Sequence, residues 1–316
     1  MSEVLTFKDA DGVEITYRRW MPDGEAKTTG DARSAAPSGN VKAIVQIAHG
    51  ASEHSERYDR FARFLTGRGY AVYADDHRGH GLTAKATGVG KSGPRGWAGM
   101  VDDLRELAHL ARTDNPDVPL VLFGHSMGSF LAQAFVQRYG SEIDGLVLSG
   151  SSGGMDNLSD LVGMLKGMAE QGGGDEPAAI FGPLNAAFEP ARTPFDWLSR
   201  DEAEVDKYIA DPMCGDDAPL TIGFVADMLG GNESTWGEGE QQIPKDLPVL
   251  TITGEADPVS DGGKTVRELE ARYTANGMTD VTGLYYPDAR HELLNETNRD
   301  AVQDDVAEWL DRVTAR

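Results

Sequence analysis

The sequence predicts an α/β protein built on a doubly wound, mainly parallel β-sheet. Short apolar runs alternate with segments of helical periodicity over most of the chain, and this alternation is typical of a parallel sheet with helices on both faces. The alternation stops after residue 151 and resumes after residue 243. We therefore expect one sheet domain, formed by residues 1–151 and 244–316, that carries an inserted helical cap, residues 152–243.

The N-terminal residues predict an antiparallel hairpin. Residues 5–7 and 13–17 alternate in polarity around Asp11-Gly12, a pair that favours a tight turn. Residues 9–12 also resemble the start of a calcium loop, but the third acidic position and the closing Glu are missing, so we expect no metal there. Residues 23–40 are rich in Gly, Ala, Ser, Thr and Pro and predict a loop.

The remaining elements of the sheet domain follow from apolar periodicity. Before the insertion, the expected strands are residues 43–48, 71–74, 120–123 and 146–148. The expected helices there are residues 58–67, 97–112 and 130–139. After the insertion, strands are expected at 248–253 and 284–286, and helices at 264–276 and 299–314.

The inserted segment differs from the rest in composition. Its 92 residues hold 18 acidic and 4 basic side chains and five of the ten methionines. One apolar stripe has helical spacing and comprises Leu158, Leu161, Val162, Leu165 and Met168. Such a stripe can pack on the core, or it can line a pocket for an aliphatic group beneath a lid. Leu158, Leu161 and Leu165 are therefore candidate substrate-binding residues.

Charge and composition argue against several classes of protein. The chain has 29 Lys and Arg against 52 Asp and Glu, a net charge of −23, so we expect no nucleic-acid partner. Its single cysteine, Cys214, excludes an intrachain disulfide and a Cys-rich zinc site. No apolar run approaches 18 residues, and the N-terminus lacks the apolar core of a signal peptide, so we expect no integral membrane segment and a cytoplasmic location.

The pentapeptide Gly124-His125-Ser126-Met127-Gly128 fits the pattern G-x-S-x-G between a predicted strand and a predicted helix. This is the context of a nucleophile elbow, a turn so tight that small residues must flank the serine. The turn places Ser126 at the carboxyl end of the sheet, where open α/β folds bind ligands. The backbone N–H of Met127, at the start of the helix, is an expected oxyanion donor.

A serine nucleophile needs a base and an acid, which follow it in the chain order Ser, Asp or Glu, His. Of seven histidines only His291 lies beyond Ser126, so His291 is the predicted base. The acid should follow the strand 248–253, and Asp257 is our choice, with Glu255 and Asp261 as alternatives. The acid would hold the imidazole tautomer and stabilise the imidazolium.

Two histidine-containing loops complete the candidate site. His49-Gly50-Ala51 ends the strand 43–48, and the N–H of Ala51 is the second expected oxyanion donor. Residues 76–81 contain two histidines and one aspartate and could suggest a metal site, but a hydrogen-bonded glycine-rich turn accounts for them. We predict a site without metal and without cofactor.

Together these motifs resemble the monoacylglycerol lipase and lysophospholipase branch of the α/β-hydrolases, of the serine aminopeptidase S33 type. Residues 49–58, HGASEHSERY, are similar to the branch's HG-x-x-EHS-x-RY, while residues 76–81 match DHRGHG and residues 124–128 match GHSMG. Residues 291–296, HELLNE, resemble HE-x-x-NE, and residues 199–212 look like the branch's cap segment. The chain departs from the pattern in residues 24–40, in residues 83–95, and at Ser129, where many members have glycine.

The resemblance implies an α/β-hydrolase fold with a helical cap over an acyl-binding channel. It implies Ser126, Asp257 and His291 as the catalytic triad, with Ala51 and Met127 forming the oxyanion hole. The expected activity is a cofactor-free serine esterase that acts on monoacylglycerols or similar small-molecule lipid esters. A short-chain carboxylesterase and a lysophospholipase are the alternatives, and a catalytically inactive binding protein with this fold is an alternative of a different class.

Overall fold

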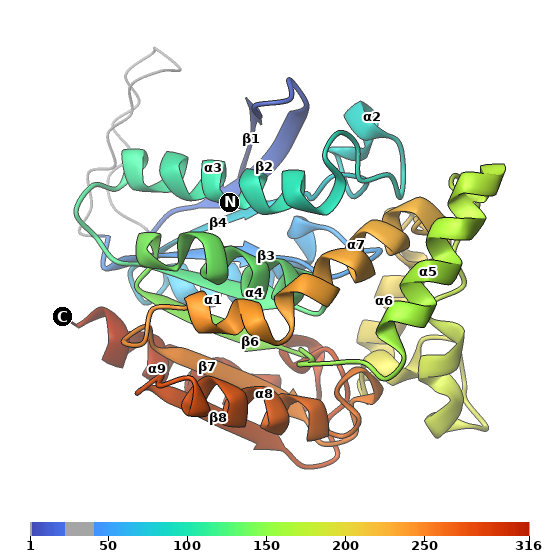
Figure 1. Ribbon diagram of the computed structural model, residues 1–316. Coiled ribbons are helices and arrows are strands. Elements are labelled where there is room, and N and C mark those ends of the chain that lie inside the picture. The colour runs from blue at the N-terminus through green and yellow to red at the C-terminus, as the bar shows by residue number, and fades with distance from the viewer. Residues whose placement is uncertain (1, 23–40, 316) are drawn as a thin grey trace.

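The computed structural model describes residues 2–22 and 41–315, and an eight-stranded sheet forms its centre (Figure 1). The strand order is β1-β2-β4-β3-β5-β6-β7-β8, with β1 and β2 antiparallel to their neighbours and the other pairs parallel. The strands are β1 (Glu3–Lys8), β2 (Glu14–Trp20), β3 (Ala43–Ala48), β4 (Tyr70–Asp75), β5 (Leu120–His125), β6 (Gly145–Ser149), β7 (Val249–Gly254) and β8 (Val281–Tyr286). The predicted hairpin and parallel sheet are confirmed, whereas the loop predicted for residues 23–40 lies outside the described residues.

Helices cover both faces of the sheet because the central strands are apolar on both sides. In β3, Ile44 belongs to the hydrophobic core under α3 (Gly96–Asp114), α4 (Met127–Tyr139) and α8 (Lys264–Ala275). Its neighbour Val45 belongs to the opposite core, under α1 (Asp59–Thr66) and α9 (Arg299–Thr314). All five predicted helices of the sheet domain are confirmed. The lengthened loop 83–95 contains a further short helix, α2 (Ala84–Thr87).

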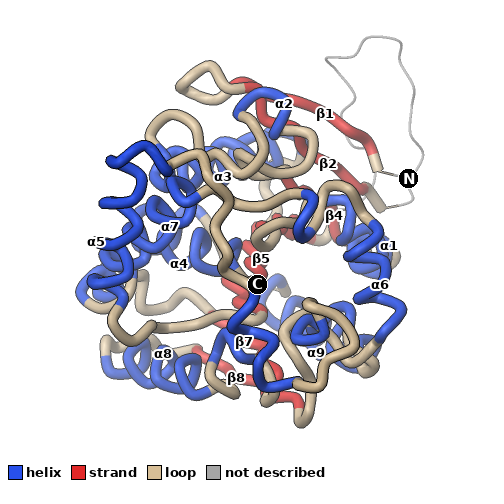
Figure 2. Tube along the Cα trace, turned by 90° about the vertical axis from the view of Figure 1, so that its right-hand side faces the viewer, coloured by secondary structure: helices blue, strands red, loops and turns tan. Residues whose placement is uncertain are grey.

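The segment between β6 and β7 contains three α-helices: α5 (Leu158–Met168), α6 (Glu202–Ala210) and α7 (Ile222–Thr235). Figure 2 shows α5 and α7 on one side of the end of the sheet and α6 on the other. We call residues 152–243 the inserted segment. Within the described part of the chain, no helix combines the length and apolarity needed to cross a bilayer.

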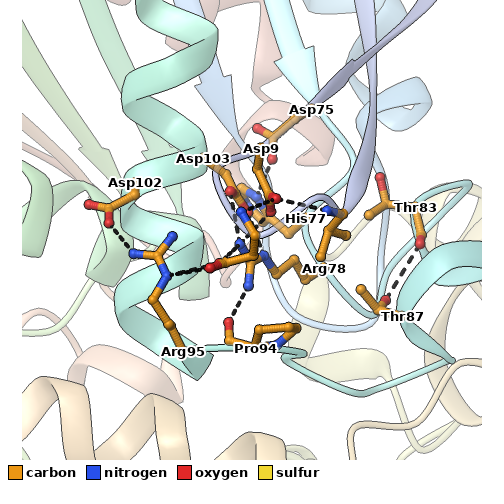
Figure 3. Close-up of polar contacts among 12 residues, drawn as sticks. Asp9, Asp75, His77, Arg78, Thr83, Thr87, Pro94, Arg95, Asp102 and Asp103 are labelled. Atoms are coloured by element: carbon orange, nitrogen blue, oxygen red, sulfur yellow. Dashed lines mark hydrogen bonds and ion pairs between the residues drawn. The ribbon is translucent and has the colours of Figure 1, made fainter.

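A buried arginine fixes the loop that follows β4 (Figure 3). The fully buried guanidinium of Arg78 donates to Asp103 of α3 at 2.7 and 3.1 Å, and also to the carbonyl of Pro94. It donates as well to Asp9 and Asp11, at 2.5 and 3.1 Å. Those two carboxylates belong to the turn between β1 and β2, so Arg78 joins the hairpin, the loop and α3.

Replacing Arg78 with Met should destabilise the protein by about 3–5 kcal/mol, because buried carboxylates would lose their partner. Urea unfolding would measure the change. The matched control is Arg95→Met, which removes an arginine that is 40 % exposed and pairs with Asp11 and Asp102; we expect it to cost less than about 1 kcal/mol. Equal effects of the two substitutions would contradict the role given to Arg78.

Candidate active site

The turn between β5 and α4 holds Ser126 in a strained conformation. Its backbone angles are φ 51° and ψ −122°, which a residue with a side chain rarely adopts. A Cβ at Gly124 would lie 2.5 Å from the carbonyl oxygen of Gly128, and a Cβ at Gly128 would lie 2.5 Å from that of His49. Both glycines of the pentapeptide are therefore required by close backbone contacts, as a nucleophile elbow demands.

His291 and Asp257 form a buried pair at the carboxyl ends of β7 and β8. Nδ1 of His291 lies 3.0 Å from both carboxylate oxygens of Asp257. The Asp257 side chain is fully buried and also accepts a hydrogen bond of 2.9 Å from the N–H of Val259. The carboxylate is thereby fixed in the orientation in which it meets the imidazole.

The two alternative acids have other partners. Glu255 pairs with Arg267 at 2.8 Å, and Asp261 lies 3.5 Å from Lys264. Both side chains are at least 40 % exposed, whereas Asp257 is fully buried. The geometry therefore favours Asp257 as the partner of His291.

The environment of His291 favours the protonated ring. Burial lowers the pKa of His291, but the negative charge of Asp257 and its hydrogen bond outweigh burial and raise that pKa above 6.5. Nε2 is buried and has no hydrogen-bond partner among the described residues. The ring of His125, next to Ser126, lies 4.9 Å from the His291 ring, so the elbow and the histidine–aspartate pair share one site.

The loop after β3 lies beside the elbow because β3 pairs with β5, with Ala48 opposite Gly124. A Cβ at Gly50 would be 3.2 Å from the Cβ of Ser126. The next residue is Ala51, the predicted oxyanion donor. We call residues 49–54 the oxyanion loop.

His49 fixes the peptide that carries the Ala51 N–H. Its Nδ1 donates to the carbonyl of Gly50 at 2.7 Å, and its Nε2 accepts from the N–H of His77 at 3.0 Å. Burial holds the pKa of His49 well below 6.5, so the ring is neutral and can donate from one nitrogen and accept at the other. The carbonyl side of the Gly50–Ala51 peptide is therefore held in place.

A buried ion network joins the oxyanion loop to the loop of His291. Arg57 donates to Glu53 at 2.5 Å and to both oxygens of Glu292 at 2.6 and 2.8 Å. Glu53 in turn accepts the N–H of Gly50 at 2.5 Å. Burial alone would raise the pKa of Glu292, but Arg57 outweighs it and lowers that pKa to about 2. Glu53, Arg57 and Glu292 belong to the motifs HGASEHSERY and HELLNE, from which their roles could not be predicted.

The inserted segment contacts both loops. The carbonyl of Leu198 accepts the N–H of Glu292 at 2.8 Å. On the other side, the carbonyl of Ser52 accepts the N–H of Gly215 and the hydroxyl of Tyr208, each at 3.0 Å. The segment is therefore in direct contact with the site.

The candidate substrate-binding residues lie on α5. Leu165 is buried, and Leu158 and Leu161 are half-buried against the same core as α7. A cleft of about 430 Å³ opens nearby, between α5, α7 and residues 87–93. The three leucines do not line this cleft, and their contact with an acyl chain stays a prediction.

One group of side chains could hold a metal ion. His54, Asp211 and Cys214 offer ligand atoms within 4.8 Å of one another. Nε2 of His54 already lies 2.9 Å from the carboxylate of Asp211, and burial raises the pKa of the Cys214 thiol, which disfavours the thiolate that binds metals. We assign no metal to this group.

Comparisons with known proteins agree on one family. Residues 39–298 match the family profile described as serine aminopeptidase, S33. A monoacylglycerol lipase of Mycolicibacterium smegmatis is 29% identical, over 96% of this chain and 95% of that protein. Human monoglyceride lipase is 28% identical, over 88% and 86%. The crystal structure of a thermostable carboxyl esterase from Bacillus coagulans matches with a TM-score of 0.87 and 29% identity over 99% of each chain.

The choice of acid can be tested by a pair of isosteric substitutions. Asp257→Asn should lower kcat for ester hydrolysis by about 10⁴-fold, because the amide would favour the wrong imidazole tautomer. Glu255→Gln should leave kcat within about twofold, because it removes a surface ion pair. Steady-state assays of both folded variants would check this. The assignment would be contradicted if Asp257→Asn left kcat unchanged while Glu255→Gln lowered it strongly.

Proposed function

The chain belongs to the serine aminopeptidase S33 family of α/β-hydrolases, and from that membership we propose that it hydrolyses carboxylic esters of the monoacylglycerol type. The observation that carries the proposal is the buried His291–Asp257 pair, 3.0 Å apart, beside the strained elbow of Ser126. The names of the monoacylglycerol lipase and monoglyceride lipase relatives support the substrate class.

In the proposed mechanism, Ser126 Oγ attacks the ester carbonyl carbon while Nε2 of His291 takes its proton. Asp257 stabilises the resulting imidazolium through Nδ1–H. The N–H groups of Ala51 and Met127 donate to the oxyanion. The ester C–O bond then breaks as His291 protonates the leaving alcohol. Water, deprotonated by His291, hydrolyses the acyl-enzyme and restores Ser126.

Residues 152–243 are proposed to act as a cap over the acyl chain. Leu158, Leu161 and Leu165 on α5 are the proposed contacts, since they are apolar and belong to, or pack against, the core that also contains residues of α7. Each buried methylene of an acyl chain contributes about 0.8 kcal/mol. A few methylenes bound there would favour medium-length over acetyl esters by an order of magnitude or more.

A short-chain carboxylesterase is the second candidate. The similarity to the carboxyl esterase from Bacillus coagulans, with a TM-score of 0.87, supports carboxylesterase activity. The two candidates share the proposed mechanism and differ in the length of the acyl chain. Rates on p-nitrophenyl esters from two to sixteen carbons, with monoacylglycerol and lysophosphatidylcholine alongside, would separate them.

Ser126→Ala should lower kcat by about 10⁶-fold and leave the fold intact, because the nucleophile would be lost without disturbing the core. Ester hydrolysis and circular dichroism would be measured together. A fluorophosphonate should label the wild-type protein and spare the variant. Near-normal turnover by Ser126→Ala would rule out the mechanism, and absence of labelling in the wild type would favour an inactive binding protein.

Leu161→Asp should lower kcat/KM for long acyl esters by at least about tenfold and nearly spare acetyl esters, because a charge would face the apolar chain. The matched control is Met164→Asp on the same helix, at a side chain that is 55% exposed; it should leave both ester classes unchanged. An equal loss on every ester with a lower Tm would mean that Leu161 only packs on the core.

A further inference from the structure

Trp197 of the inserted segment lies directly against the imidazole of His291. The centroids of the two rings are 4.9 Å apart and their planes are inclined by 40°. Both side chains are almost fully buried.

The position of the indole is set by contacts on several sides. Asn185 accepts the backbone N–H of Trp197 at 3.0 Å. The carbonyl of Trp197 accepts the N–H of His291 at 3.4 Å. Phe181 stacks on the indole with centroids 5.8 Å apart and planes inclined by 26°. These contacts hold the indole in a fixed position relative to the loop that carries His291.

We propose that Trp197 is a positioning residue that holds the His291 ring and stabilises its imidazolium form. The proposal rests on the proposed function, in which His291 becomes an imidazolium as Ser126 is acylated. An aromatic ring within about 6 Å of a cation attracts it, and the attraction is stronger where water is excluded. Because the indole packs against the imidazole, it also restricts rotation of that ring away from Asp257.

Several other neighbours of His291 are charged or titratable, and the contribution of the uncharged indole can be distinguished from theirs. The charged and titratable side chains that face it are Asp257, His125, Glu53 and Glu292. His125 is neutral, because burial and the charge of His291 lower its pKa to about 4. Glu53 and Glu292 share the cation Arg57. Asp257 is thus the principal counter-charge, and the indole is an uncharged contact whose removal changes no formal charge.

The test compares Trp197→Leu and Trp197→Phe with the matched control Trp236→Leu, which removes an indole of the inserted segment that packs on Phe130 of α4. For Trp197→Leu we expect kcat on a p-nitrophenyl ester to fall about three- to tenfold with KM nearly unchanged. The acid limb of kcat/KM should move to lower pH, because an imidazolium that loses stabilisation forms only at lower pH. Trp197→Phe should recover most of both effects, and Trp236→Leu should show neither.

Indole fluorescence supplies a readout that does not depend on turnover. A neighbouring imidazolium quenches tryptophan emission, so emission present in the wild type and absent from Trp197→Phe should titrate with the midpoint of the acid limb. His291→Ala should abolish that titration. The titration can be followed in Ser126→Ala, which separates failure of this proposal from failure of the proposed function.

Two results would overturn the proposal. One is an unchanged acid limb and unchanged kcat in a folded Trp197→Leu. The other is a wild-type emission difference that does not titrate, which would overturn the proposal even if Trp197→Leu failed to fold.

Discussion

The strained turn at Ser126 is the constraint on which the rest of the site depends. A φ of 51° at a residue with a side chain costs on the order of 1–3 kcal/mol and persists only where the surroundings enforce it. Here β5 is paired on both sides, with β3 and β6, and all six of its residues are buried. The close approach of Gly128 to the end of β3 then fixes where the oxyanion loop must run.

The Arg57 network holds together two loops that are far apart in the sequence, the oxyanion loop and the loop of His291. Arg57 and Glu292 are 235 positions apart, yet their side chains form a bidentate pair inside the protein. Buried ion pairs add little net stability, because desolvation offsets the attraction. They do enforce a defined arrangement, since any displacement of either loop would leave a buried charge without its partner. The network therefore keeps the oxyanion loop and His291 in a fixed position relative to each other.

The sequence predicted those features of the fold and of the candidate site that local residue patterns determine. Periodicity identified the strands and helices, the pentapeptide selected Ser126 as the candidate nucleophile, and elimination selected His291 as the candidate base. The choice between Asp257 and Glu255 was different, because both follow the same strand within three residues. It depended on the partner of each carboxylate, and the pairing of Glu255 with Arg267 is a contact that spacing does not reveal. No sequence pattern predicted the ring contact of Trp197 with His291, because Trp197 lies in the inserted segment and His291 in the sheet domain.

The contacts of the inserted segment also limit how it can move. Its middle part is bound to the site on two sides, through Leu198 to Glu292 and through Tyr208 to Ser52. Lifting that part away would release the loops that hold His291 and Ala51, the proposed oxyanion donor. In α5, by contrast, Met164 and Met168 are exposed to solvent, and the helix packs mainly on α7. If residues 152–243 act as the proposed cap, an opening that admits an acyl chain and preserves the proposed catalytic geometry takes place at α5 and leaves Leu198 and Tyr208 in position.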